Sequence, residues 1–311
     1  MTDIKKILLL YIKGVAMGSA DVVPGVSGGT IAFITGIYER LLNAIKSIDL
    51  EALRLLRQMK LKEFWQHIDG TFLVVLVAGI ATSVFSLAKV ITHLLSTYPI
   101  HVWSFFFGLI VISALIILRE IKKWSIGVFL AILIGIVAAY FITSATPAET
   151  PESSWFLFIA GAVAICAMIL PGISGSFILL LFGKYEYILT VIKDFKIGDM
   201  LIFGMGCIVG LLSFARLVGW LFKKFHNITV GVLSGFMIGS LNKVWPWKEA
   251  IQTYIDRHKE IKPLVEVNVL PTDYLEKTGQ EPFFLQAMLF AAGGFLIVLA
   301  IDRLAAYLKS D

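Results

Sequence analysis

Charged residues are scarce in this chain. Only 16% of its 311 residues are Asp, Glu, Lys or Arg, whereas 58% are hydrophobic. A soluble domain carries about 25% charged residues, so most of this surface must face a medium other than water. Several apolar stretches reach the roughly 20 residues of helix that cross a lipid hydrocarbon core. The sequence therefore predicts a polytopic membrane protein.

Other signals are also missing, and each absence narrows the class of protein. The two cysteines lie inside apolar segments without a disulfide framework, and the five histidines have no metal-ligand spacing, so neither a metal nor a cofactor is expected. The net charge is +5, but the basic residues are confined to loops and segment ends, which favours membrane topology over nucleic-acid binding. The two-residue alternation of a membrane barrel is lacking too, so the expected fold is all-α.

An internal repeat divides the chain. The stretch Pro24-Gly25-Val26-Ser27-Gly28-Gly29 matches Pro171-Gly172-Ile173-Ser174-Gly175-Ser176, and a second block pairs 85–89 with 212–216. Each half is predicted to hold a re-entrant helical hairpin and three transmembrane helices. The first repeat spans 1–145, with its hairpin at about 7–45 and helices at about 71–97, 101–118 and 124–143. The second spans 150–311, with its hairpin at about 155–193 and helices at about 199–222, 228–245 and 283–305.

The two repeats are predicted to have inverted topology. Each half crosses the membrane an odd number of times, so the second half begins on the opposite side. Charge agrees, because the basic segments 46–67 and 119–123 are expected in the cytoplasm and the acidic loop 144–154 outside. Continued alternation places the 248–281 loop outside and both termini in the cytoplasm. Inverted repeats with broken helices are the usual build of secondary transporters.

The Pro-Gly-x-Ser-Gly breaks have a direct physical use. Proline ends the incoming helix, glycine allows a reversal, and the next helix begins with unpaired N–H groups and a partial positive charge that attract an anion. Two such tips would meet near the membrane centre and hold a phosphate between them. The predicted phosphate-binding residues are Gly25, Val26, Ser27, Gly28, Gly29, Gly172, Ile173, Ser174, Gly175 and Ser176, with the matched cations Lys89 and Arg216. Tight turns with a serine cap are the alternative for the tips, and snorkelling to the interface is the alternative for the cations.

Three acidic residues accompany the hairpins. Asp21 precedes the first motif, while Met168 stands at the equivalent position of the second, so any coupling to a proton or cation belongs to the first hairpin. Capping or pairing with a base is the alternative role for Asp21. Glu39 and Glu186 occupy matched positions at the ends of the hairpins, where they are expected to stabilise them.

The first motif also carries a resemblance. The stretch from Gly14 to Thr30, followed by Gly36-Ile37-Tyr38-Glu39, resembles the signature of the bacterial polyprenyl-phosphate transporter family called PopT. The resemblance covers nearly the whole chain. It implies a flippase, not an enzyme, in the bacterial cytoplasmic membrane. Its partner would be undecaprenyl phosphate, the carrier lipid of cell-wall precursors, which it would return from the outer to the cytoplasmic leaflet.

Two other functions stay open. A membrane polyprenyl-pyrophosphate phosphatase also has inverted repeats and a Pro-Gly-x-Ser-Arg-Ser motif, but Gly28 or Gly175 stands here in place of the arginine that would stabilise a phosphoryl transition state. A carrier or channel for a small soluble anion would use the same tips. The oligomeric state and the coupling ion are not determined by the sequence.

Overall fold

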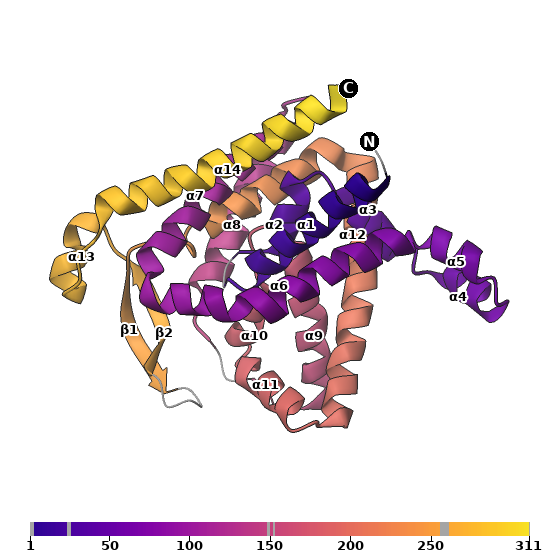
Figure 1. Ribbon diagram of the computed structural model, residues 1–311. Helices are drawn as coiled ribbons and strands as arrows, with labels where there is room; N and C mark the ends of the chain where they lie inside the picture. The colour runs from indigo at the N-terminus through magenta and orange to yellow at the C-terminus, as the bar shows by residue number, and fades with distance from the viewer. Residues whose placement is uncertain (1–2, 24–25, 148–149, 152, 256–260, 311) are drawn as a thin grey trace.

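The computed structural model describes residues 3–23, 26–147, 150–151, 153–255 and 261–310, and it is mostly helical (Figure 1). The first half contains α1 (Asp3–Asp21), α2 (Gly28–Ile34), α3 (Tyr38–Lys46), α4 (Leu50–Arg57), α5 (Leu61–His67), α6 (Gly70–Thr97), α7 (Pro99–Leu118) and α8 (Ile126–Ser144). The second half contains α9 (Ser154–Ile169), α10 (Gly175–Leu181), α11 (Tyr185–Lys193), α12 (Ile197–Ser240), β1 (Lys248–Ile255), β2 (Ile261–Asn268), α13 (Pro271–Thr278) and α14 (Phe284–Ser310).

The apolar helices are long enough to cross a membrane. Five of the described helices, α6, α7, α8, α12 and the 284–303 part of α14, meet that requirement by length and composition. The backbone of α12 is non-helical at Phe225, with φ −135° and ψ 47°, and this kink separates the two helices predicted at 199–222 and 228–245. The bent pair α10 and α11, at 108°, has the shape of a broken span or a re-entrant segment.

Each half begins with a folded-back pair of helices. α1 packs against α2, and α9 packs against α10, so the chain reverses at both Pro-Gly-x-Ser-Gly breaks. The long helix that follows each hairpin packs along its first arm, α6 against α1 and α12 against α9. Each break therefore lies between two packed helices, with a long helix along the first of them.

Glycines lie at equivalent positions of the repeats where these two pairs of helices cross. A Cβ added to Gly14 or Gly79 would meet the backbone of the opposing helix where α1 crosses α6, and a Cβ added to Gly161 or Gly206 would do so where α9 crosses α12. Gly14 and Gly161 are separated by the same interval as the two Pro-Gly-x-Ser-Gly motifs, and Gly79 and Gly206 by the interval of the second repeated block. Close backbone approach of this kind is how small residues pack membrane helices.

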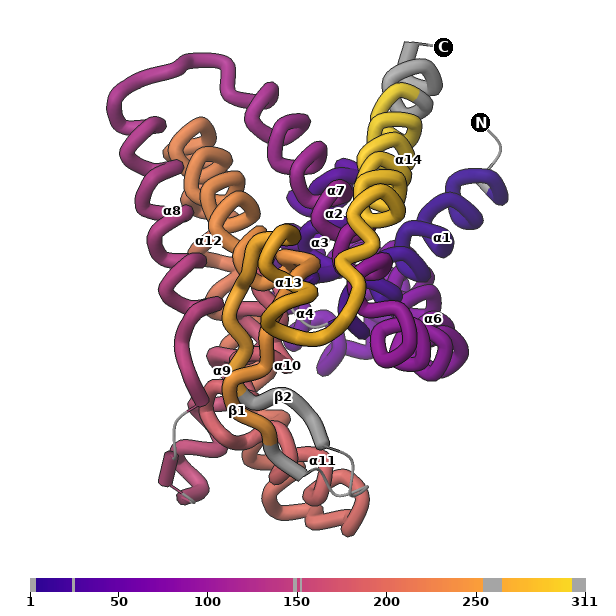
Figure 2. The backbone as a smooth tube through the Cα atoms, turned by 90° about the vertical axis from the view of Figure 1, so that its left-hand side faces the viewer, coloured from indigo at the N-terminus to yellow at the C-terminus, as the bar shows by residue number. Residues whose placement is uncertain are grey.

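The last helix of each repeat packs on the other repeat. α8 lies along the second part of α12, and α14 lies along α7 (Figure 2). Gly235 and Gly135 bring α12 and α8 together backbone to backbone, and Gly108 and Gly294 do the same for α7 and α14. The internal repeat is thus visible in packing as well as in sequence, with one helix exchanged in each direction.

A β-hairpin interrupts the helical pattern. The sequence predicts a loop over 248–281, whereas the structure places β1 and β2 there as an antiparallel pair, with Lys248 opposite Asn268 and Ala250 opposite Glu266. The indole of Trp247 donates a hydrogen bond to the carbonyl oxygen of Pro282, which ties the base of the hairpin to the segment before α14. The α13 helix follows the hairpin (Figure 1).

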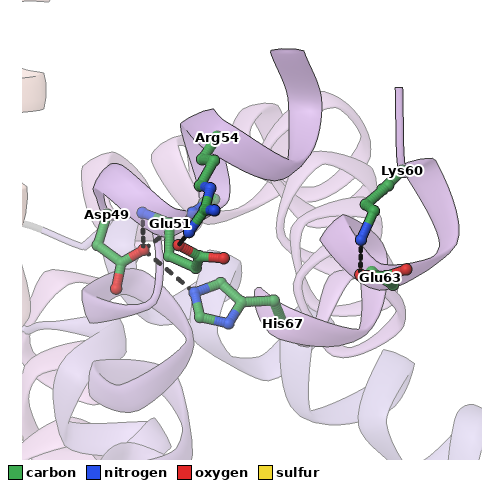
Figure 3. A network of polar contacts seen from close by, with 7 residues as sticks. Asp49, Glu51, Arg54, Lys60, Glu63 and His67 are labelled. Atoms are coloured by element: carbon green, nitrogen blue, oxygen red, sulfur yellow. Dashed lines mark hydrogen bonds and ion pairs between the residues drawn. The ribbon is translucent and has the colours of Figure 1, made fainter. Parts of the chain in front are cut away.

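The loops divide between two sides of the molecule. The start of α1, the end of α14 and the α4–α5 pair lie toward the right of Figure 1, and the β-hairpin with α13 lies toward the left. The α4–α5 pair is held by polar contacts of Asp49, Arg54 and His67, while Lys60 pairs with Glu63 (Figure 3). The α4–α5 pair and the outer ends of α1 and α14 thus lie away from the β-hairpin in this view.

Candidate functional site

The first tip lies between α1 and α2 in the protein interior. Val26 and Ser27 are fully buried, and Ser27 caps α2 by accepting a hydrogen bond at Oγ from the Gly29 N–H at 3.0 Å. Its extended backbone, with φ −124° and ψ 137°, is the usual conformation of an N-cap residue. Two residues of the motif, Pro24 and Gly25, lie outside the described residues.

The Asp21 side chain, at the end of α1, contacts the start of α2. Its Oδ1 accepts a hydrogen bond from the Gly28 N–H at 2.7 Å, at the start of α2. A Cβ at Gly28 would lie 2.5 Å from the other carboxylate oxygen, so alanine here would require the Asp21 side chain to shift. A carboxylate therefore already stands where an incoming anion would meet this N–H group.

The second tip lies between α9 and α10 and is built differently. Gly172 has φ +87°, a conformation that favours glycine, and Ile173 behind it is buried. Ser174 begins α10 without a side-chain cap bond, and its Oγ lies 2.7 Å from the Oγ of Ser176. This tip thus presents a pair of hydroxyls where the first tip has its own cap and carboxylate.

The structure brings the two tips into direct contact. The Ser27 hydroxyl donates to the carbonyl oxygen of Met168 at 2.9 Å, and the Gly172 N–H donates to Oγ1 of Thr30 at 3.0 Å. A Cβ at Gly29 would meet the carbonyl oxygen of Ile169. Two hydrogen bonds and one backbone contact therefore join hairpins that start about half the chain apart.

Thr30 is a site residue that sequence reasoning missed. Its side chain is fully buried, and its hydroxyl is the acceptor that fixes the second tip on the first. Phe177 occupies the equivalent position of the second repeat, so comparison of the repeats carried no signal for a hydroxyl here. Two indications were available: Thr30 directly follows the first motif, and it is the last residue of the stretch that resembles the PopT signature.

The matched cations lie away from this contact. Lys89 on α6 and Arg216 on α12 are both exposed. Arg216 donates to the carbonyl oxygen of Leu212 at 3.3 Å and to that of Ile48, between α3 and α4, at 3.2 Å. The structure therefore places Arg216 at the connection that leaves the first hairpin, and a role for this pair at a phosphate stays a prediction.

The acidic residues at the hairpin ends have different surroundings. Glu39 on α3 lies 3.7 Å from Nε2 of His226, just beyond the kink in α12, and forms an ion pair when that imidazole is protonated. Its neighbour Arg40 pairs with Asp69 at 2.7 Å. Glu186 lies in the first turn of α11. Glu39 thus lies beside a residue of the second repeat, and the stabilising role of Glu39 and Glu186 stays a prediction.

Chemically, the contact between the tips offers hydrogen-bond donors and no metal set. Within residues 3–23, 26–147, 150–151, 153–255 and 261–310, no three His, Cys, Asp or Glu side chains gather where they could bind a metal ion. The groups at the tips are backbone N–H groups and the hydroxyls of Ser27, Thr30, Ser174 and Ser176. Such groups suit an oxyanion that enters between the hairpins.

Comparison with known proteins identifies relatives over nearly the full length. A sequence profile for undecaprenyl phosphate translocase-like proteins matches residues 17–262. A polyprenyl-phosphate transporter of Vibrio cholerae is 44% identical over 298 residues, which cover 96% of this chain and 97% of that protein. A polyprenyl-phosphate transporter of Staphylococcus aureus is 31% identical over 254 residues, covering 76% and 85%. No solved structure gives a significant match.

Proposed function

This chain belongs to the family of undecaprenyl phosphate translocase-like proteins, and from that premise we propose that it flips undecaprenyl phosphate across the bacterial cytoplasmic membrane. The lipid moves from the outer to the cytoplasmic leaflet, where it is used again for cell-wall precursors. The names of the two relatives support polyprenyl phosphate as the substrate class. They also favour transport over the phosphatase alternative, as does glycine in place of the motif arginine.

The contact between the two tips is the observation that carries this proposal. A monophosphate head group needs hydrogen-bond donors inside the membrane, because an unpaired charge in hydrocarbon is very costly. The tips would supply them through the hydroxyls of Ser174, which is buried, and Ser176, which is half-buried, and through the Gly172 N–H once it leaves Oγ1 of Thr30. The isoprenoid tail can remain in lipid beside the apolar helices while the head group passes between the hairpins.

Asp21 gives the transport cycle a point of coupling. The phosphate can reach the Gly28 N–H only when the Asp21 carboxylate moves aside, because the two anions would repel each other at one helix start. Uptake of a proton by Asp21 would remove that repulsion. We infer that protonation of Asp21 accompanies entry of the lipid phosphate, and that the second repeat, with Met168 in the equivalent place, takes no part in this step.

Leaflet exchange of a short-chain polyprenyl phosphate in proteoliposomes tests the site. Ser27→Ala removes the bond to the Met168 carbonyl and the α2 cap, and Ser174→Ala removes one of the paired hydroxyls. We expect each variant to slow exchange by about tenfold or more, since a hydrogen bond to a charged group is worth about 1.5–3 kcal/mol. The matched control is Ser113→Ala, a buried serine on α7 that bonds to its own helix at Leu109.

The same assay tests the coupling step through Asp21→Asn. The amide oxygen can still accept from Gly28, but an amide neither carries the charge nor takes up a proton. We expect exchange to lose its response to a proton gradient while the protein stays folded. A gradient response equal to that of the unaltered protein would reject Asp21 as the coupling group, and unaltered exchange in both serine variants would reject the site.

A further inference from the structure

A separate polar cavity lies beside the second hairpin. Its volume is about 360 Å³, and it is bounded by the C-terminal end of α8, by α10 and by the base of the β-hairpin. The residues that matter for its chemistry are Ser144, Phe177, Asn242, Lys243, Lys248 and Glu266. It lies on the side that the charge pattern predicts to be outside the cell.

The cavity carries more positive than negative charge. The ammonium groups of Lys243 and Lys248 each lie 3.8 Å from the same oxygen, Oε2 of Glu266. The single Glu266 carboxylate thus faces two ammonium groups, and both lie farther from it than a hydrogen bond. The side chains of Lys243, Lys248 and Glu266 are only 20%, 8% and 28% exposed, so water screens the excess positive charge weakly.

The Lys248 ammonium is buried, so its charged form is stabilised by a nearby anion. Its Nζ donates to the carbonyl oxygen of Lys243 at 2.7 Å and lies 4.1 Å from the centre of the Trp103 ring. Burial lowers the pKa of Lys248 to about 8; Glu266 acts in the opposite direction, and Lys243 lowers it further. A second anion in the cavity would restore the charged form and offset the cost of burial.

Amide side chains give the cavity a fixed wall. Nδ2 of Asn242 donates to Oγ of Ser144 at 3.0 Å, and Nδ2 of Asn268 donates to Oδ1 of Asn242 at 2.8 Å. Asn268 also donates to the backbone carbonyl oxygen of Asn242 at 2.9 Å. These bonds join α8, the end of α12 and β2, so the elements beside the two lysines are cross-linked by hydrogen bonds.

The cavity adjoins the second tip. The Lys243 ammonium lies 4.8 Å from the centre of the Phe177 ring on α10, and Phe177 directly follows Ser176. Gly172 of the tip packs against Ser240, at the end of α12 and three residues before Lys243. A ligand in the cavity therefore sits next to the structure that supports the second tip.

We propose that this cavity binds a phosphate monoester through Lys243 and Lys248, in exchange for their shared partner Glu266. The inference rests on the proposed function, in which this is where the lipid head group is captured before it reaches the tips. A polyprenyl phosphate and free inorganic phosphate present the same group to the lysines. The length and membrane anchoring of the ligand are what distinguish them.

Calorimetric titration of the purified full-length protein in nanodiscs tests the site with three probes: a ten-carbon isoprenyl phosphate, the parent alcohol and inorganic phosphate. We expect Lys243→Gln and Lys248→Gln to weaken binding of the isoprenyl phosphate by about tenfold or more. Glu266→Gln should strengthen it, because it removes the competing carboxylate. A variant that failed to fold could not bind more tightly, so this gain separates the site from general damage.

Lys277→Gln provides the matched control, since it removes the same charge from an exposed position on α13. Tighter binding of isoprenyl phosphate than of inorganic phosphate supports a lipid head group as the ligand, and equal binding of the two supports a site for free phosphate. Equal binding of the alcohol and its phosphate would overturn the proposal. So would unchanged affinity in both Lys243→Gln and Glu266→Gln.

Leaflet exchange separates this inference from the proposed function. If the unaltered protein exchanges the lipid and the cavity variants bind and exchange like it, the cavity fails as a site while the function stands. If the unaltered protein exchanges no lipid but the cavity variants change phosphate binding as expected, the function fails and the phosphate site stands.

Discussion

At the scale of single residues, the approach of the two hairpins depends on the absence of one carbon atom. Gly29 faces the carbonyl oxygen of Ile169, and a Cβ there would collide with backbone, which cannot rotate away as a side chain can. The neighbouring bonds from Ser27 and to Thr30 need the same short separation. Gly29 is thus the position where the contact between the tips is least tolerant of added volume.

Gly29→Ala should force the tips apart. We expect a loss of about 1–3 kcal/mol in the free energy of unfolding, the usual cost of overpacking, seen as a lower thermal midpoint in detergent. Gly204→Ala is the control, because its Cβ would meet nothing within 4 Å and alanine favours a helix by up to about 1 kcal/mol over glycine. A midpoint for Gly29→Ala equal to or above that of Gly204→Ala would contradict this reading.

The sequence indicated part of this residue-scale picture. The serine after a Pro-Gly break is a cap signal, and Ser27 does cap α2. The acceptor of its hydroxyl, the Met168 carbonyl, is a backbone atom and has no signature in a sequence. The position of Arg216 was also beyond reach, because the matched repeats suggest equivalent cations but not that Ile48 would lie beside one of them.

At the scale of elements, the α4–α5 pair is a short structure held by its polar ends. Asp49 accepts hydrogen bonds from the N–H groups of Glu51 and Ala52, both at 3.0 Å, and lies 3.1 Å from Nε2 of His67 (Figure 3). Isolated helices of this length are marginal in water, so the cap adds to the stability that α4 gains from burying Ala52 and Leu55. The bond from Ala52, followed by those from His67 and Glu51, holds the pKa of Asp49 below its usual value.

Asp49→Ala should loosen α4 while leaving the long helices intact. We expect its local stability to fall by about 0.5–2 kcal/mol, measured as faster amide hydrogen exchange in 50–57 than in α12. Because the folded pKa is the lower one, the contribution of Asp49 is complete above its ordinary pKa and fades as the pH falls through the folded value. The control is Glu63→Ala, which breaks only an exposed pair with Lys60; an equal effect of both changes would argue against the cap.

The β-hairpin marks the limit of prediction at this scale. Apolar length and the Pro-Gly breaks located the membrane helices, because those signals are strong and local. β1 and β2 are short and of mixed charge, and a lone hairpin is marginal without packing. Its support comes from contacts such as that of Trp247 with Pro282, which no sequence pattern reveals. The cavity lysines were missed for the same reason, since β2 carries Glu266 to them.

At the scale of the whole molecule, each repeat completes the other. α8 of the first half packs on α12 of the second, and α14 of the second packs on α7 of the first. Gly108 and Gly235, one at each of these crossings, are separated by the interval of the second repeated block. Neither half therefore has all of its helix packing surfaces covered on its own.

Separate expression of 1–147 and 153–311 should show this dependence. We expect each half alone to be degraded or aggregated, because α7 and α8, or α12 and α14, would lack their partners. Expressed together, the halves should assemble and purify as one complex that binds isoprenyl phosphate. A split placed inside α7 is the control and should not assemble. Stable folding of the first half alone would show that the exchanged helices are dispensable.

The exchanged helices also limit how this protein can move. Each repeat packs its last helix on the other repeat. The two halves therefore cannot move apart as rigid bodies without unpacking α8 from α12 or α14 from α7. The first arms of the hairpins, in contrast, pack within their own repeats, α1 along α6 and α9 along α12. We therefore expect alternating access to come from movement of the two hairpins relative to the packed long helices. Rigid-body rotation of one half against the other is not expected.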